Sequence, residues 1–158
     1  MIPHRGSVFS GETSLKGEAQ METNKLIRFT NPETLPPTFG YSHVVEVRNA
    51  RTIYISGQVA LDKSGQLVGA GDMSAQTRQV FENIRIALEA VGLFFEDVVK
   101  LTFFMTDISQ MKFVREIRDQ YINTQNPPAS SAVEVRKLIQ EDLLIEIEAV
   151  AVAALDPQ

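Results

Sequence analysis

Two glutamates interrupt an apolar run near the C-terminus, and they are the first residues whose setting suggests chemistry. The run is LLIEIEAVAVAAL, and its alternation puts Glu146 and Glu148 on one side of a strand with Ile145 and Ile147 on the other. A carboxylate held among apolar groups can act as a general base or hold a water for attack. Alternating charges also protect exposed edge strands from aggregation. We assign Glu148 this protective role, and for Glu146 both interpretations stay open.

Other reactive side chains are scarce. The chain has no cysteine and only two histidines, His4 and His43. Thiolate chemistry is therefore excluded, and a histidine-based metal centre would lack ligands. The sequence contains no glycine-rich phosphate loop and no Ser-His-Asp arrangement. We therefore predict neither a metal nor a cofactor, and we expect His43 to be a structural histidine.

The composition is that of an ordinary globular protein. Its 158 residues, 44% of them hydrophobic, can form one domain with a core and without disulfides. No stretch approaches the roughly 20 apolar residues of a membrane span. Residues 1–20 lack the apolar region of a secretory signal, so we expect a cytoplasmic protein. The net charge of −5 argues against a nucleic-acid partner. We interpret residues 1–20 as an N-terminal extension and residues 21–158 as a single domain.

The elements that must position the glutamates follow from the apolar periodicity. Asp72 can cap a helix whose apolar positions recur at helical spacing as far as Gly92. A second helix is expected over residues 109–123, before two prolines. The β-branched runs 42–47 and 52–57 are separated by RNAR, which predicts a hairpin between them. The other strand patterns cover residues 25–29, 98–105, 130–135 and 143–153.

The element order is therefore βββαβαββ, which indicates an α+β domain. Two helices can cover only one face of the sheet. The other face keeps apolar residues such as Val150 and Val152 beside the glutamates. An uncovered apolar face of this kind usually marks association. We therefore predict an oligomer that buries the open face.

Several segments, in this order, resemble one known family. They are TIYISGQVALD, AQTRQVFENIRIALEAVGLFFEDVVKLTFFMTD, NPPASSAVEV and LLIEIEAVAVA. Over residues 26–153 the chain is similar to the Rid superfamily, the YjgF-type proteins also called endoribonuclease L-PSP. The resemblance implies a chorismate mutase-like α+β fold with a mixed sheet and two helices on one face. It also implies a homotrimer with small-molecule clefts between subunits. Members of the RidA subgroup hydrolyse reactive imines and enamines, such as 2-aminoacrylate, to keto acids and ammonia.

Four residues match the site that the resemblance implies. Tyr41 in FGYSH corresponds to the tyrosine of the family's G-P-Y motif. Ser56 and Gly57 correspond to the pair that lines the pocket with backbone groups. Glu146, the first glutamate of IEIEA, corresponds to the residue thought to position the attacking water. The resemblance thus makes Glu146 the expected catalytic residue, with Tyr41, Ser56 and Gly57 binding the substrate.

The segment PASSAVEV differs from the RidA motif P-A-R-S-C-V-E-V. Ser130 stands where an arginine grips the substrate carboxylate, and Ala132 stands where the motif has a cysteine. A serine hydroxyl cannot replace a planar, charged guanidinium. Losing such a charge-assisted contact typically costs about 1.5–3 kcal/mol. We therefore expect a substrate other than 2-aminoacrylate.

The second predicted helix also departs from the family pattern. Met111 and Arg115 stand where the family has a pocket phenylalanine and a pocket asparagine. Their i, i+4 spacing lets both face one cleft. Arg115 either supplies the cation that Ser130 lacks or pairs with an acidic neighbour, Asp119 or Glu146. We favour the pairing over the relocated anchor.

Three functions remain in view. The first is a hydrolase, or deaminase, of a small imine, enamine or related metabolite at intersubunit clefts. The second is a trimer that binds a small ligand without catalysis. The third, ribonuclease activity, rests only on the family's older name, and the acidic charge balance counts against it.

Overall fold

The structure is a computed structural model, and it describes residues 25–155. The predicted N-terminal extension, residues 1–20, lies outside these residues. In chain order the elements are β1 (Leu26–Thr30), β2 (Val44–Arg48), β3 (Ala50–Val59), α1 (Met73–Glu89), β4 (Val98–Met105), α2 (Met111–Arg118), β5 (Ala129–Glu134) and β6 (Ile145–Ala154). Short 3-10 turns, η1 (Phe95–Asp97) and η2 (Ile108–Gln110), precede β4 and α2. The predicted order βββαβαββ is confirmed.

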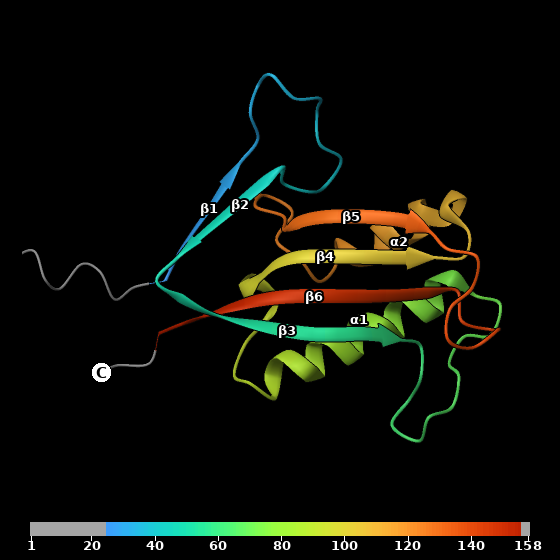
Figure 1. Ribbon diagram of the computed structural model, residues 1–158. Helices are drawn as coiled ribbons and strands as arrows, with labels where there is room; N and C mark the ends of the chain where they lie inside the picture. The colour runs from blue at the N-terminus through green and yellow to red at the C-terminus, as the bar shows by residue number, and fades with distance from the viewer. Residues whose placement is uncertain (1–24, 156–158) are drawn as a thin grey trace, which may run out of the picture.

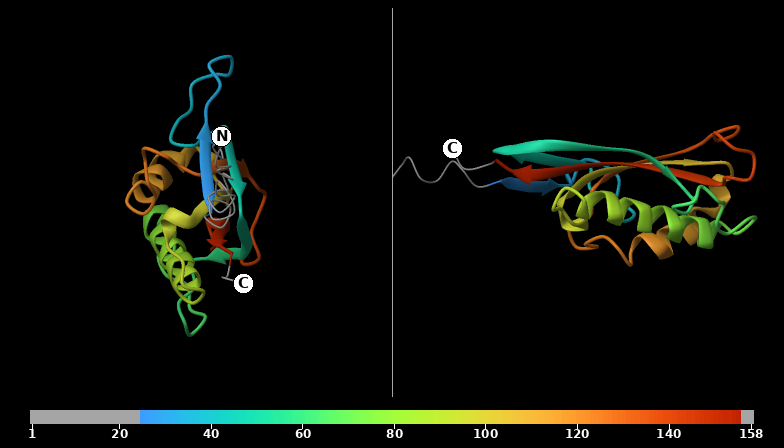
Figure 2. Two further views of the ribbon diagram at one scale, coloured as in Figure 1. Left: turned by 90° about the vertical axis from the view of Figure 1, so that its left-hand side faces the viewer. Right: turned by 90° about the horizontal axis from the view of Figure 1, so that it is seen from below.

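The strands form a four-stranded sheet and a separate two-stranded sheet (Figure 1). The larger sheet has the order β3-β6-β4-β5, with β4 and β5 parallel and the other neighbours antiparallel. Both helices lie on one side of it, beneath the strands in the right-hand view of Figure 2. The predicted α+β class and the placement of two helices on one face are confirmed. We call the other side of this sheet the open face.

The predicted hairpin between residues 42–47 and 52–57 is wrong. Strand β2 pairs with β1, and β3 pairs with β6. Asn49, between them, has a φ of 52°, a left-handed conformation that asparagine tolerates. The chain therefore turns a corner there, and β1 and β2 diverge from the larger sheet (Figure 1).

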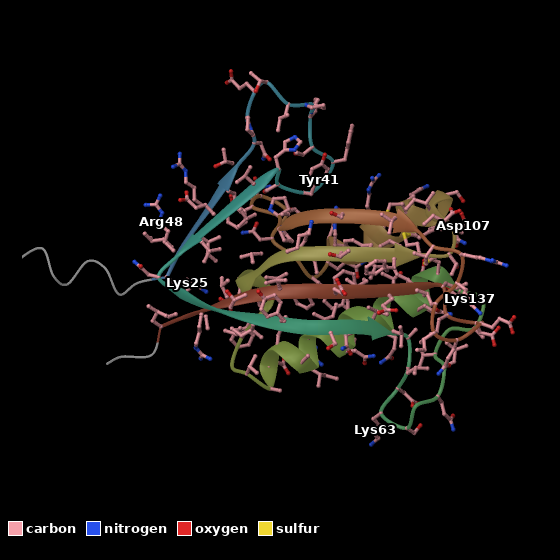
Figure 3. The ribbon with its side chains drawn as sticks, viewed as in Figure 1. Lys25, Tyr41, Arg48, Lys63, Asp107 and Lys137 are labelled. Atoms are coloured by element: carbon pink, nitrogen blue, oxygen red, sulfur yellow. The ribbon has the colours of Figure 1, made fainter. Side chains whose placement is uncertain are left out.

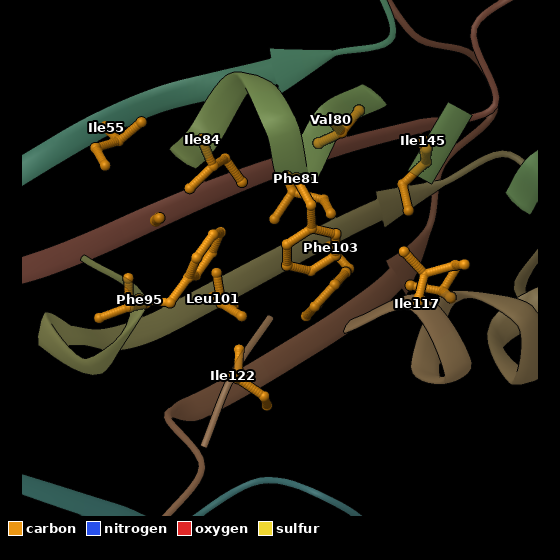
Figure 4. Close-up of a cluster of buried hydrophobic side chains, with 14 of the residues drawn as sticks. Ile55, Val80, Phe81, Ile84, Phe95, Leu101, Phe103, Ile117, Ile122 and Ile145 are labelled. Carbon is orange, nitrogen blue, oxygen red and sulfur yellow. The ribbon is translucent and has the colours of Figure 1, made fainter. Parts of the chain in front are cut away.

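The core lies between the helices and the inner face of the four-stranded sheet (Figure 4). Strands β4 and β6 alternate as their sequences predict, so that every second side chain points to the helices. Phe81 and Ile84 of α1 pack into this layer and are fully buried. Burying side chains of this size contributes roughly 1.5–3 kcal/mol each. The fully buried strand residues are Leu101, Phe103, Met105, Ile145, Ile147 and Ala151.

Helix α1 begins where the sequence predicts. The Asp72 carboxylate accepts a hydrogen bond from the Ala75 amide at 3.0 Å, which satisfies one of the unpaired donors of the first turn. The helix ends at Glu89, and Gly92 follows with a φ of 72°. None of the helices within residues 25–155 is long and apolar enough to cross a membrane.

Helix α2 is shorter than predicted, because it ends at Arg118 instead of continuing to residue 123. Tyr121, which the predicted helix would have included, instead stacks on Phe81 of α1 with ring centroids 4.9 Å apart. Its hydroxyl donates to the Glu82 carboxylate at 2.8 Å. Burial, together with this hydrogen bond, raises the pKa of the Tyr121 hydroxyl to about 12. Tertiary packing on α1 thus replaces the last turns of the predicted helix.

Candidate functional site

Glu146 and Glu148 lie on the open face of the sheet. The register pairs Glu146 with Phe104 of β4 and Glu148 with Thr102, and paired residues point to the same side. Glu146 is half-buried and Glu148 is exposed. Continuing across the sheet, Val133 lies beside Phe104, and Ser131 lies beside Thr102. We call these lines across the strands the Glu146 row (Glu146, Phe104, Val133) and the Glu148 row (Glu148, Thr102, Ser131).

Strand β3 bulges beside the two glutamates. Its pairing with β6 is regular up to Ile55 and resumes at Gln58, so that Ser56 and Gly57 fall in a register shift. Such bulges re-aim backbone groups and often lie next to functional sites. The Gln58 side-chain amide donates to the Ser56 carbonyl at 3.0 Å. The two residues predicted to present backbone groups are thus the two that leave the regular ladder.

The Glu146 carboxylate lies directly over Gly57. A Cβ atom added to Gly57 would come within 1.9 Å of Glu146 Oε1 and 2.8 Å of its Cδ. Real carbon atoms do not approach this closely, so the side chain of Glu146 occupies the space that any other residue at position 57 would need. Gly57 also lines a groove of about 580 Å³ between the end of β3 and α1. Its backbone is therefore reached from the sheet face and from the sheet edge.

Ser130 and Ala132 lie on the other face. The parallel pairing sets Ser130 beside Leu101 and Ala132 beside Phe103, and both of these neighbours are buried under the helices. Because β5 is an edge strand, Ser130 remains half-buried and Ala132 is exposed. Within one protomer, the sheet therefore separates these two residues from Glu146.

Tyr41 belongs to the loop between β1 and β2, which reaches over the start of β5 (Figure 3). The next residue, Ser42, is buried and donates from its hydroxyl to the Pro127 carbonyl at 2.7 Å. Its amide donates to the Pro128 carbonyl at 3.2 Å. The half-buried Tyr41 ring meets His43 edge to face, with centroids 5.5 Å apart. The loop is thus anchored two residues before Ser130.

Below this loop, Arg118 of α2 is almost completely buried, at 3% exposure. It pairs with Asp119, with 2.7 Å between Nη2 and Oδ1. Gly40 has a φ of 75°, and a Cβ atom there would lie 2.1 Å from Arg118 Nη2. The loop that carries Tyr41 can therefore settle on α2 only because position 40 has no side chain. Sequence reasoning missed this contact, although the glycine before Tyr41 was the available signal.

Met111 and Arg115 lie on α2, in the helix layer. Met111 is partly buried against the core, and Arg115 is exposed. Asp119, one of the two predicted partners of Arg115, pairs with Arg118 instead. No ion pair of Arg115, with Asp119 or Glu146, occurs within residues 25–155. The predicted pairing with Asp119 is therefore wrong, and the pairing with Glu146 stays a prediction for the assembled protein. Within the protomer Arg115 is exposed on the helix.

The predicted site residues thus fall into two groups within a protomer. Ser56, Gly57 and Glu146 lie together at the end of β3 and the start of β6; we call them the glutamate half-site. The loop-and-helix half-site, near β5 and α2, holds Tyr41, Met111, Arg115, Ser130 and Ala132. Ala129 lies beside the anchored loop. Along β5 it is four residues from Val133 of the Glu146 row, and β5 is two strands away from β6, which carries Glu146. At about 3.3 Å per residue and 4.8 Å per strand, its Cα lies roughly 16 Å from that of Glu146.

One polar residue of the open face was not predicted as part of a site. Lys100 of β4 is half-buried, and its ammonium donates to the Ser131 hydroxyl at 2.8 Å. The alternation in VVKLTFFM was the available signal, because it puts Lys100 and Thr102 opposite Leu101 and Phe103. Among residues 25–155, no group of three or more histidine, cysteine or acidic residues could hold a metal ion.

The family model and named relatives identify the family of this chain. The family model described as Endoribonuclease L-PSP matches residues 32–153. A RutC family protein from Pyrococcus horikoshii is 40% identical over 121 residues, which cover 75% of this chain and 92% of that protein. A human 2-iminobutanoate/2-iminopropanoate deaminase is 43% identical over 113 residues, or 71% of this chain and 79% of that enzyme.

Solved structures agree with the sequence comparison. A Rid family protein from Yersinia pestis superposes with a TM-score of 0.74 at 37% identity, covering 80% of this chain and 98% of that one. The YjgF gene product of E. coli gives a TM-score of 0.57 at 34% identity, covering 66% and 86%. On the matched family model, the shared fold and these identities, the chain belongs to the Rid superfamily, the YjgF or endoribonuclease L-PSP family.

Proposed function

We propose that this protein hydrolyses a small reactive imine or enamine to a carbonyl compound and ammonia. The observation that carries the proposal is the Glu146 carboxylate set over Gly57 on a half-apolar sheet face. Two relatives, the human protein and one from Salmonella typhimurium at 38% identity, are named 2-iminobutanoate/2-iminopropanoate deaminases. A carboxylate beside backbone groups of a bulge suits the positioning of water for such a reaction.

The reaction would proceed through Glu146 as a base. The carboxylate takes a proton from water while the water oxygen bonds to the imine carbon and the C=N electron pair moves to nitrogen. The protonated glutamate returns that proton to the nitrogen, which completes a carbinolamine. Glu146 then passes the proton of the carbinolamine hydroxyl to the nitrogen, the C–N bond breaks, and the carbonyl forms as ammonia leaves. Backbone groups of Ser56 and Gly57 would orient the reacting group beside this carboxylate.

We further propose that the complete site lies between copies of the chain in a homotrimer. The glutamate half-site and the loop-and-helix half-site come from opposite faces of the sheet, so one protomer cannot join them. A ring of copies would bring the first half-site of one protomer to the second half-site of its neighbour. The exposed Tyr54, at 80%, and Val133, at 45%, give the face apolar surface to bury in such a ring.

The test measures ammonia release from a panel of freshly generated imines. We expect turnover by the wild type and a loss of about 10²–10⁴-fold in kcat for Glu146→Gln, with the melting temperature little changed. Light scattering on the same samples should give the mass of three chains. Equal turnover by wild type and Glu146→Gln would remove Glu146 from the chemistry, and a monomer that turns over would refute the shared site.

Position 130 favours a second candidate, a trimer that binds a small ligand without catalysis. Ser130 does not provide the cation of the RidA motif, and Arg115 is exposed in the protomer. If no imine in the panel is turned over while ligands still raise the melting temperature, this second function replaces the first. Ribonuclease activity finds no support in the charge balance, and we do not propose it.

A further inference from the structure

The position of Tyr41 is set by the residues on either side of it in the chain. Its own hydroxyl makes no hydrogen bond within residues 25–155, which leaves this group available to a ligand. Ser42, which follows it, bonds to the segment before β5. Gly40, which precedes it, lies against Arg118 of α2. The loop therefore has one contact with β5 and a separate contact with α2.

The contact with α2 is made by a charged side chain that is almost completely buried. Arg118 is only 3% exposed, which is rare for an arginine. Oδ1 of Asp119 accepts a hydrogen bond from Nε at 2.8 Å and lies 2.7 Å from Nη2. Two charge-assisted contacts to one oxygen fix the direction of the planar guanidinium. Asp119 therefore compensates the buried charge and holds the arginine in one position.

The nitrogen that pairs with Asp119 is also the atom nearest to the loop. Nη2 of Arg118 lies 2.1 Å from the position that a Cβ of Gly40 would take, and Cζ and Nη1 lie 3.1 and 3.4 Å from it. A lysine has neither Nη2 nor Nη1, because its chain ends in a single ammonium. The guanidinium thus sets how closely Gly40 approaches α2, and Tyr41 is the next residue.

Helix α2 carries two other residues of the same half-site. Met111 and Arg115 precede Arg118 by about two turns and about one turn of the helix. The contact between Arg118 and Gly40 therefore fixes the loop of Tyr41 to the element that carries both. A side chain that is already fixed loses little freedom when it binds a ligand, so this arrangement favours binding.

We propose that Arg118, held by Asp119, is the positioning residue for Tyr41. Arg118 touches neither the substrate nor the reacting atoms, and it acts in the reaction through the tyrosine. The proposal rests on the function proposed above, in that Tyr41 binds the substrate at the shared site. It gives α2 a part in substrate binding that does not depend on Arg115.

The first experiment measures the position of the Tyr41 ring by NMR, without substrate and with all samples at pH 8. The chain has two histidines, and the His43 ring lies edge to face with Tyr41, with 5.5 Å between centroids. The ring current of Tyr41 therefore shifts the His43 ring signals, and the difference between wild type and Tyr41→Leu defines this shift. Arg118→Lys should lose at least half of it. Lys112→Met, an exposed charge change on the same helix, should keep it.

Amide spectra show whether each variant is folded. Gly40→Ala disturbs the same contact from the side of the loop, so it should also move the His43 signals. If a folded Arg118→Lys keeps the full shift, Arg118 does not position Tyr41. If Arg118→Lys does not fold, Gly40→Ala decides, and an unchanged shift in that variant refutes the proposal. Equal losses in Lys112→Met and Arg118→Lys would refute it as well.

The second experiment is kinetic and uses an imine of the panel that the wild type turns over. Arg118→Lys should raise KM roughly tenfold and keep kcat within about threefold, because it disturbs binding and not Glu146. It should add nothing further in the Tyr41→Leu variant, since Arg118 acts through the tyrosine. Effects that simply add would refute this route. If no imine is turned over, the proposed function fails, and the NMR shift still decides whether Arg118 positions Tyr41.

Discussion

Replacing Gly57 with alanine is the sharpest test of how the glutamate half-site is built. The φ of Gly57 lies outside the left-handed region, so an alanine backbone fits there without strain. The new methyl group, however, would lie 1.9 Å from Glu146 Oε1. To reach ordinary contact the oxygen must move by about 1.5 Å. The substitution therefore displaces the carboxylate and leaves the strand in place.

The structure gives different magnitudes for stability and for activity. Glu146 can escape by rotating its side chain, which costs about 0.5–1.5 kcal/mol. Alanine in place of glycine stabilises the folded state by about 0.4–1 kcal/mol, because it restricts the unfolded chain. The two effects nearly cancel, so the melting temperature should change by about 4 °C or less. A catalytic group misplaced by about 1 Å can cost about 10²-fold. We therefore expect kcat for imine hydrolysis to fall roughly a hundredfold while stability is nearly kept.

The assay compares kcat for Gly57→Ala, Glu146→Asp and the double variant, with melting temperatures alongside. Aspartate is shorter by one methylene, so it relieves the contact with the new methyl group. Glu146→Asp should therefore lower kcat much less in the Gly57→Ala variant than in the wild type. Such non-additivity indicates a direct contact between the two residues. If Gly57→Ala keeps kcat within threefold of wild type, or if the two losses simply add, the packing argument is wrong.

Two further predictions concern stability. Gly40→Ala should lower the free energy of unfolding, measured in urea, by about 2 kcal/mol or more, because it strains a φ of 75° and its methyl group clashes with buried Arg118. Gly65→Ala is the control, since its φ is 79° and the space around it is open, and it should lose clearly less stability. Equal losses for the two variants would contradict the contact with Arg118. The pKa of Tyr121 is raised to about 12 in the folded protein. The contribution of the neutral hydroxyl to the free energy of unfolding is therefore complete below pH 10 and is lost as pH rises through 12. Unfolding measured from pH 8 to 12 should therefore show a steeper decline for wild type than for Tyr121→Phe, and parallel curves would exclude the linkage.

Local signals predicted the elements well where packing and pattern agree. The Asp72 cap and the apolar spacing located α1, and the run 98–105 coincides with β4. The end of α2 could not be predicted, because Tyr121 leaves the helix to stack on Phe81, a contact 40 residues away in sequence. The incorrect hairpin between residues 42–47 and 52–57 has a similar cause. RNAR has the composition of an ordinary turn, but Asn49, with a φ of 52°, directs β3 to pair with the distant β6 instead of with β2.

The site was predictable strand by strand but not across strands. Alternation correctly placed Glu146 and Glu148 on one side of β6. It could not show that Ser130 faces the helices, because this depends on the parallel register with Leu101. Alternation within β4 puts Lys100 on the same side as Thr102, but its hydrogen bond to Ser131 joins two strands and could not be predicted from either strand alone.

The position of β6 has a consequence for how the protein is made. This strand is the last element of the described chain, yet it lies inside the sheet and joins β3 to β4. Before this strand leaves the ribosome, β3 has no partner in that sheet, and β4 is paired along one edge only. The emerging chain must wait for residues 145–154 to close its core. Because Glu146 arrives on the same strand, an incomplete chain has neither the finished sheet nor its carboxylate.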